Sequence, residues 1–194
     1  MRARILEAVA AIIARDGLAG IGINALARQA GCDKVLIYRY FGDLDGVHSA
    51  FAAQSDFWWT VEAMTAGIDP SRTSPAAALK MILRRHAEAL RARPVTLAVL
   101  AAETVERTRL VVALETVRER RSLELAGWMD RHFRLPADLD AAAVVMLLGV
   151  AINYLALRGR NIRVMAGVAI RTGRDWQRIL AAVDVLIDGV LPER

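Results

Sequence analysis

Residues 23–41 constrain the fold of this 194-residue chain more than any other stretch. Two short runs with helical spacing, at about 24–30 and 34–40, flank Gly31. Helices of that length are not stable alone in water, so neighbouring elements must pack against them. Gly31 can adopt the left-handed conformation of a sharp turn, and Asp33 can cap the helix that follows. The segment therefore predicts a helix-turn-helix.

Helical periodicity continues along nearly the whole chain. Apolar side chains recur at helical spacing in residues 5–14, and Gly42 and Asp43 repeat the pattern of a helix stop followed by a cap. Longer helices are expected at about 44–64, 76–92, 95–106, 109–133, 138–158 and 174–191. No stretch alternates with the period of two that a half-buried strand requires. We predict an all-α fold of about nine helices, with residues 159–173 as an irregular arm.

The composition describes a foldable globular protein, with 55% apolar and 24% charged residues. The net charge of +5 permits an anionic partner without requiring one. Residues 1–50 hold six Arg or Lys against five Asp or Glu, a net charge of only +1. An argument for DNA binding must therefore rest on where individual charges are placed.

Several classes of protein are disfavoured. The single cysteine, Cys32, excludes an intrachain disulfide and a cysteine-based zinc site. The chain starts without the apolar run of a signal peptide, so we expect a cytoplasmic protein. The run 141–157 is shorter than the ~20 residues of a membrane span, and a helix buried on all sides is preferred. His48, His86 and His132 are scattered outside any catalytic or metal motif, so we predict no enzyme activity, metal or cofactor.

The predicted helix-turn-helix leaves a set of side chains suited to DNA on its outer face. Those spaced to face inward are Leu26, Ala30, Cys32, Ile37 and Phe41. The predicted DNA contacts are the remaining Asn24, Arg28, Lys34, Val35, Leu36, Tyr38, Arg39 and Tyr40. Lys34 can reach guanine or a phosphate, Asn24 an adenine or a phosphate, and Val35 and Leu36 the thymine methyl groups. Any helical bundle can show short helices with surface charges, so that alternative stays open on periodicity alone.

Residues 2–50 resemble the DNA-binding domain of the TetR family of bacterial transcriptional regulators. The matching residues are the helix at 5–14, Asp16-Gly17, the run 26–31 and Lys34, with the ending Tyr38-Arg39-Tyr40-Phe41 as the most distinctive piece. The resemblance implies base contacts from residues 34–36 and from Asn24 or Arg28, and phosphate contacts from Tyr38, Arg39 and Tyr40. It also implies a DNA-binding domain at 1–47 and a ligand-binding and dimerisation domain at 48–194.

The chain departs from the family pattern at three places. Gly22 stands where the second helix usually begins with Ser or Thr, which makes a poorer cap. Val35 and Leu36 replace residues that are usually smaller, so this helix face is unusually apolar. Leu44 replaces a common Lys and removes an expected phosphate anchor. We therefore expect modest operator affinity, or a stronger dependence on Tyr38 and Arg39.

The late helices at 138–158 and 174–191 are apolar on more than one face, which suggests a partner helix. The TetR resemblance implies a homodimer through these helices, with two recognition helices in successive major grooves of a palindromic DNA operator. A helix buried wholly within its own domain is the alternative for 138–158. No membrane partner is expected.

Aromatic and Met side chains in the larger part suit a dry, adaptable cavity for a small-molecule effector. The pocket candidates are Trp58, Trp59, Met64, Met81, His86, Trp128, Met146 and Asn153. Ordinary core packing is the alternative for each, and His86 could equally lie on the surface. Neighbours on a helix diverge by about 100°, so one of Trp58 and Trp59 would face the cavity and the other a neighbouring helix.

The function predicted from the sequence is a ligand-responsive transcriptional regulator, most simply a repressor released from DNA by an apolar or aromatic effector. A helical adaptor protein that does not read DNA is the alternative. The operator sequence, the effector and the regulated genes do not follow from the sequence.

Overall fold

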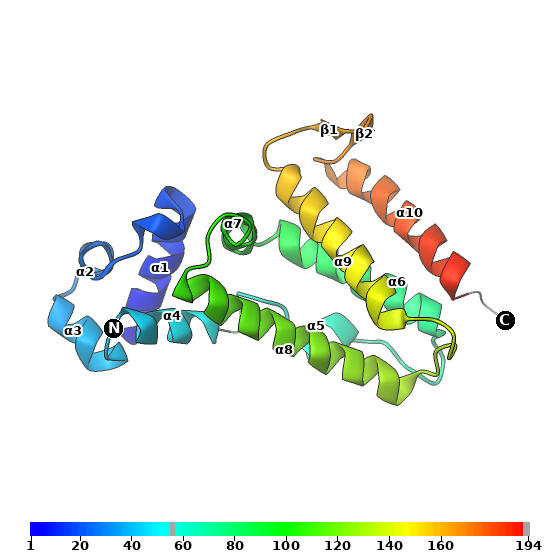
Figure 1. Ribbon diagram of the computed structural model, residues 1–194, viewed down its shortest axis with the longest axis horizontal. Coiled ribbons are helices and arrows are strands. Elements are labelled where there is room, and N and C mark those ends of the chain that lie inside the picture. The colour runs from blue at the N-terminus through cyan, green and yellow to red at the C-terminus, as the bar shows by residue number, and fades with distance from the viewer. Residues whose placement is uncertain (55–56, 192–194) are drawn as a thin grey trace. The chain divides into compact units, whose positions relative to one another are not determined.

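The computed structural model of the chain describes residues 1–54 and 57–191. Within them the ten helices are α1 (Arg2–Asp16), α2 (Ile23–Ala30), α3 (Lys34–Phe41), α4 (Leu44–Ala52), α5 (Val61–Thr65), α6 (Pro75–Arg91), α7 (Pro94–Ala102), α8 (Arg109–His132), α9 (Ala141–Arg158) and α10 (Gly173–Val190) (Figure 1). A short 3-10 helix, η1 (Leu18–Gly20), follows α1. Strands β1 (Val164–Met165) and β2 (Val168–Ala169) form an antiparallel hairpin between α9 and α10. The all-α prediction is confirmed, with ten helices in the described residues where about nine were expected.

One compact unit comprises Met1–Trp58 and Arg93–Arg120. In it α1 packs on α2, α4 and α7 through its apolar stripe, in which Ile5, Val9 and Ile12 are fully buried. The stripe forms because these positions recur every three or four residues and so share one face of the helix. Leu26 of α2 and Ile37 of α3 are also fully buried, and they fix the two short helices that could not stand alone.

The other compact unit comprises Trp59–Ala92 and Arg121–Arg194, so α8 contributes residues to both units. In the second unit α6 packs against α5, α9 and α10. Lys80 and Arg84, one turn apart on α6, form ion pairs with Asp188 and Asp184, one turn apart on α10. The predicted division into a DNA-binding domain at 1–47 and a ligand-binding domain at 48–194 concerns function, and it stays a prediction.

The expected helix at 44–64 is wrong, because α4 ends at Ala52 and α5 begins only at Val61. Residues 55 and 56 of that expected helix lie outside the described residues. Phe57, Trp58 and Trp59 are all buried, and they lie outside any helix. Three consecutive side chains on one helix would point about 100° apart, so a helix could not bury all three on one side. Trp58 and Trp59 are therefore not neighbours on a helix as expected, and which of them lines a ligand cavity stays a prediction.

Two expectations about the C-terminal third also change. Residues 159–173 contain the β1–β2 hairpin, with Ala166 and Gly167 at positive φ in a two-residue turn. Strands of two residues are too short to show period-two alternation, which explains the prediction of an irregular arm. In α9 only Ile152 and Ala156 are buried, so the helix is not buried on all sides within the chain. Among the described residues α9 alone is long and apolar enough to cross a membrane, with a mean hydropathy of 1.9.

Candidate nucleic-acid interface

The turn between α2 and α3 is closed by local hydrogen bonds. Gly31 adopts the left-handed conformation, with φ 58° and ψ 47°, and its amide donates to the carbonyl of Arg28. The amide of Cys32 donates to the carbonyl of Ala27 at 3.0 Å. On the far side of the turn, Asp33 Oδ1 accepts the amide of Val35 at 2.8 Å and caps α3. The roles expected of Gly31 and Asp33 are therefore confirmed.

A second tight junction joins α3 to α4. Gly42 ends α3, and Asp43 Oδ1 accepts the amide of Gly46 at 2.8 Å, which confirms the expected stop and cap. A Cβ at Gly46 would lie 1.8 Å from the carbonyl oxygen of Phe41, so no other residue fits without moving the backbone. This close approach fixes the angle at which α4 follows α3. Nothing in the sequence pattern separates Gly46 from an ordinary helical glycine.

Arg4 of α1 braces the helix-turn-helix from outside. Its Nη2 atom donates to the carbonyl oxygens of Ala30 and, at 3.2 Å, Gly31. These carbonyls end α2, where helix carbonyl groups lack partners within the helix and where positive charge is favoured. The brace ties the turn directly to α1. Arg4 was not singled out from the sequence, because a basic residue near the start of an amphipathic helix usually faces solvent.

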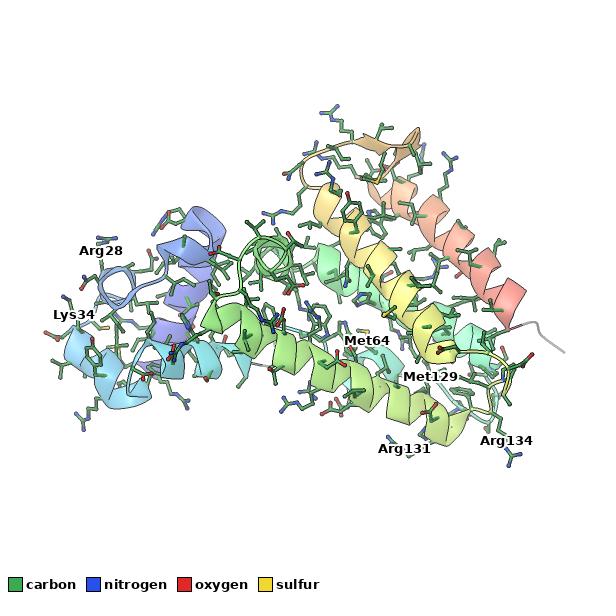
Figure 2. The ribbon with its side chains drawn as sticks, in the orientation of Figure 1. Arg28, Lys34, Met64, Met129, Arg131 and Arg134 are labelled. Atoms are coloured by element: carbon green, nitrogen blue, oxygen red, sulfur yellow. The ribbon has the colours of Figure 1, made fainter. Side chains whose placement is uncertain are left out.

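Seven of the eight predicted DNA contacts are exposed, and Leu36 is half-buried. The exposed side chains are those of Asn24, Arg28, Lys34, Val35, Tyr38, Arg39 and Tyr40. Figure 2 shows Arg28 and Lys34 pointing away from α2 and α3. Val35 keeps 68% of its surface exposed, although it is apolar and sits in the first turn of α3. A single large exposed apolar residue needs no explanation, but one at the start of a recognition helix suits contact with a base edge.

The inner face of the motif differs slightly from expectation. Leu26, Ala30 and Ile37 are buried as predicted, whereas Cys32 and Phe41 are only half-buried. Cys32 lies in the turn, where the chain changes direction, and the guanidinium of Arg2 lies 5.4 Å from the centroid of the Phe41 ring. These two positions are therefore covered from one side only.

Three of the pocket candidates meet in the second unit. Trp59 Nε1 donates to His86 Nδ1 at 2.8 Å, and His86 Nε2 lies 2.8 Å from Asn153 Oδ1. Since Nδ1 accepts a hydrogen bond, Nε2 carries the ring proton and donates to Asn153. Burial lowers the pKa of His86 to about 4, so the imidazole is neutral at pH 7. The alternative of a surface position for His86 is wrong.

The other pocket candidates lie apart from this network. Met64 is buried in α5, and Arg85 donates to its carbonyl at 2.6 Å and to that of Ala66, just after the helix, at 2.7 Å. Met81 and Trp128 pack, with Met129, on a separate buried cluster of Ile68, Ala78, Ile82 and Phe133. Trp58 belongs to the first unit, and Met146 is 58% exposed on α9. The assignment of these residues to a ligand pocket stays a prediction.

The chain is similar in sequence and in fold to known helix-turn-helix proteins. Residues 5–47 match the family model of bacterial regulatory proteins of the tetR family. A putative TetR-family transcriptional regulator from a Rhodococcus species shares the fold, with 21% identity, a TM-score of 0.70 and 98% of each chain covered. No curated protein matches the sequence.

Two further structures concern regulators called FadR. The fatty acid degradation regulator FadR from Bacillus halodurans is 18% identical, with a TM-score of 0.66 over 100% of this chain and 97% of that one. FadR from Bacillus subtilis, solved in complex with stearoyl-CoA, is 16% identical, with a TM-score of 0.64 over 98% and 97%. At these identities the likeness shows the fold.

Proposed function

Since the chain belongs to the TetR family of bacterial transcriptional regulators, which are not enzymes, we propose that it is a repressor that binds a palindromic operator as a homodimer and leaves it when a small molecule binds. The observation that carries the proposal is the exposed face of α3, held in place by the caps and by Arg4. Its side chains are the predicted readers, with Lys34 and Val35 in the first helical turn and Tyr38 and Arg39 toward phosphates. A regulator of this kind works in the cytoplasm, where its operator lies.

The homodimer is supported by apolar side chains that the single chain leaves uncovered. On α9 these are Val145, Met146, Leu147, Val150 and Tyr154, and on α10 they are Val185 and Leu186. At 100° per residue Met146, Leu147, Val150 and Tyr154 lie on the side of α9 away from Ile152 and Ala156, so one side of the helix packs in the chain and the other is exposed in the described residues. An apolar surface of this extent needs a partner, and a second copy related by a two-fold axis supplies the same surface.

Sedimentation at micromolar concentration tests the dimer against a monomer. Leu147→Glu is expected to convert the dimer to monomers, because it places a charge in the apolar face. Leu123→Glu is a matched control on α8, since both leucines are 63% exposed. A wild-type monomer, or equal behaviour of the two variants, would refute the proposed interface. Partition of the wild-type chain into detergent instead would favour a membrane role for α9.

An apolar effector is supported by the chemistry of the second unit. The buried cluster around Ile82 and Phe133 is flanked by half-buried Met81, Trp128 and Met129, whose side chains can rearrange around an apolar guest. The stearoyl-CoA in the Bacillus subtilis FadR structure makes long-chain acyl-CoA the first class to test. We expect acyl-CoA to release the chain from its operator and CoA alone to leave it bound. Retention of the operator with every acyl chain length would exclude this class.

A route for the release is suggested by α8. Arg109, at its first residue, forms an ion pair with Asp45 of α4, and α4 follows the recognition helix directly. Because α8 extends into the second unit, we propose that effector binding shifts α8 and that the ion pair passes the shift to α4. The helix that would pass the shift to α3 is thus α4 alone, which is shorter than the helix expected from the sequence.

The experiment that tests the proposed function is selection of bound DNA from a random pool, followed by screening of ligands for release. A palindromic site with two half-sites about one helical turn apart is the expected result. Failure to enrich any sequence, with a stable protein complex recovered instead, would favour the adaptor.

A further inference from the structure

The connection between α9 and α10, together with the last residue of α9 and the first turns of α10, has a charge unlike that of the rest of the chain. Residues 158–178, here called the arginine hairpin, contain six Arg and one Asp, a net charge of +5. The whole chain also nets +5, from 26 Lys and Arg against 21 Asp and Glu. The remainder therefore holds 20 residues of each sign and is neutral. The net positive charge of the protein is concentrated in this one segment.

The arginine hairpin is anchored on the second unit. The amide of Ile170 donates to the carbonyl of Arg163 at 3.0 Å, which closes the hairpin beyond the two strands. Trp176 Nε1 donates to the carbonyl of Ile170 at 3.1 Å, and both side chains are buried. The guanidinium of Arg91 lies 5.3 Å from the centroid of the Trp176 ring and covers it. The hairpin therefore presents its charges from a fixed base.

Five of the six Arg of the hairpin face solvent. Arg160, Arg163, Arg171, Arg174 and Arg178 are exposed, and Arg158 is half-buried. In the described part of the chain none of these six forms an ion pair, whereas Lys80 and Arg84 of α6 are paired. The one acidic group of the segment, Asp175, accepts the amides of Arg171 and Thr172 at 2.9 and 2.7 Å. Figure 2 shows side chains ending in nitrogen directed outward around the hairpin.

We propose that the arginine hairpin is a second DNA-binding surface, which contacts the phosphate backbone of duplex DNA without regard to sequence. All its cations are Arg, whose planar guanidinium pairs with phosphate through two hydrogen bonds. A lipid surface fits less well, because an element that lies on a membrane needs a large apolar face. Val164 is the only large apolar side chain exposed on the described hairpin. The proposal goes beyond operator reading, because this surface needs neither the operator nor the effector.

Sequence-independent contacts of this kind hold a regulator near DNA while it searches for its operator. Two parts of DNA binding would then come from different regions of the protein. The nearly neutral helix-turn-helix supplies discrimination, and the arginine hairpin supplies charge. Loss of the hairpin is then expected to weaken binding to every duplex by a similar factor.

The test measures binding to a fluorescent duplex that lacks the operator, over a range of salt concentrations. The triple variant R160Q/R163Q/R171Q is compared with R72Q/R131Q/R134Q, which removes three exposed Arg elsewhere in the second unit (Figure 2 labels Arg131 and Arg134). We expect the hairpin triple to lower the slope of log K against log salt by about three, with at least about a tenfold loss of affinity at low salt. The control triple is expected to change the slope by less than about one. The lysine triple R160K/R163K/R171K is expected to keep the slope.

An unchanged slope in the hairpin triple would overturn the proposal, and so would equal losses in the hairpin and control triples. Binding to vesicles of anionic phospholipid that depends on the hairpin, with DNA binding unaffected, would also overturn it and favour a membrane surface. The single variant R163Q, with an expected fall of about one in slope, repeats the test with minimal change to the fold. Failure of operator reading is distinguishable, because Lys34→Ala is expected to lower the preference for the operator and to leave the effect of the hairpin triple on a random duplex intact.

Discussion

The helix-turn-helix and the second unit use polar side chains in opposite ways. In the described residues of α1 to α4 the polar side chains cap helices or face outward, with the exception of His48 in α4, whose ring nitrogens are buried. The second unit buries His86 between Trp59 and Asn153, and it exposes five Arg of the hairpin that form no ion pair within the described residues. Residues 1–50 carry a net charge of only +1, so the helix-turn-helix must rely on the positions of its individual side chains to bind DNA. The comparison separates recognition by geometry from attraction by charge.

Adding one methyl group at Gly46, at the junction of α3 and α4, should change the protein most. In Gly46→Ala the new Cβ would lie 1.8 Å from the carbonyl oxygen of Phe41, so the junction between α3 and α4 must open. We expect the free energy of unfolding to fall by about 3 kcal/mol or more, and operator binding to be lost. Urea denaturation measures the first and anisotropy the second.

Gly189→Ala is the matched control for this substitution. Gly189 lies inside α10 with no atom within 4 Å of an added Cβ, so the change is expected to stabilise the chain by up to about 1 kcal/mol. A Gly46→Ala variant as stable as the control would show that the helix-turn-helix tolerates movement at the junction of α3 and α4. The claim that it depends on fixed geometry would then be wrong.

The buried network of the second unit should respond to pH. Burial lowers the pKa of His86 from 6.5 to about 4, so the unfolded chain takes up a proton that the folded chain refuses. The contribution of His86 to the free energy of unfolding is therefore fully present above pH 6.5. It is lost as the pH falls toward 4, by about 3 kcal/mol in total. Denaturation of wild type and His86→Gln at several pH values measures it, because acidic groups common to both cancel. Parallel curves for the two proteins would contradict the neutral buried imidazole.

The brace at the turn should matter less than either. Arg4→Ala leaves the carbonyls of Ala30 and Gly31 without their side-chain donor, at an expected cost of about 1–3 kcal/mol in the free energy of unfolding. Operator affinity should fall with it, since the turn positions α3. Arg2→Ala is the control, because it removes the same charge and only a cation–π contact worth about 0.5–1 kcal/mol. Equal melting temperatures for the two variants would remove the brace from the explanation.

The smallest expected effect is a gain. Gly22 begins α2 without a side-chain cap, so Gly22→Ser should raise the free energy of unfolding by a few tenths of a kcal/mol. The added hydroxyl can also reach a phosphate, and a modest rise in operator affinity is expected at low salt. Thermal melts and anisotropy measure the two changes. A loss of stability would mean that the extended conformation at Gly22 does not suit a capping residue.

How much could be predicted from the sequence follows from the range of the contacts involved. Gly31, Asp33, Gly42 and Asp43 were assigned correctly because each acts on backbone groups within a few residues. The break before α5 could not be predicted, since it arises from the burial of three consecutive aromatic residues. The partners of His86 are 27 and 67 residues away, and no local pattern reports them. Gly46 and Arg4 were missed because their roles depend on tertiary approach.

The positions of individual side chains on α3, rather than the net charge of the domain, give the protein its preference for an operator. The most direct test is the ratio of affinities for the selected operator and a random duplex, measured across salt for wild type and Lys34→Ala. We predict that Lys34→Ala lowers this ratio by about tenfold to a hundredfold, while Arg72→Ala leaves it unchanged. A Lys34→Ala protein that keeps the wild-type ratio at every salt concentration would contradict the claim.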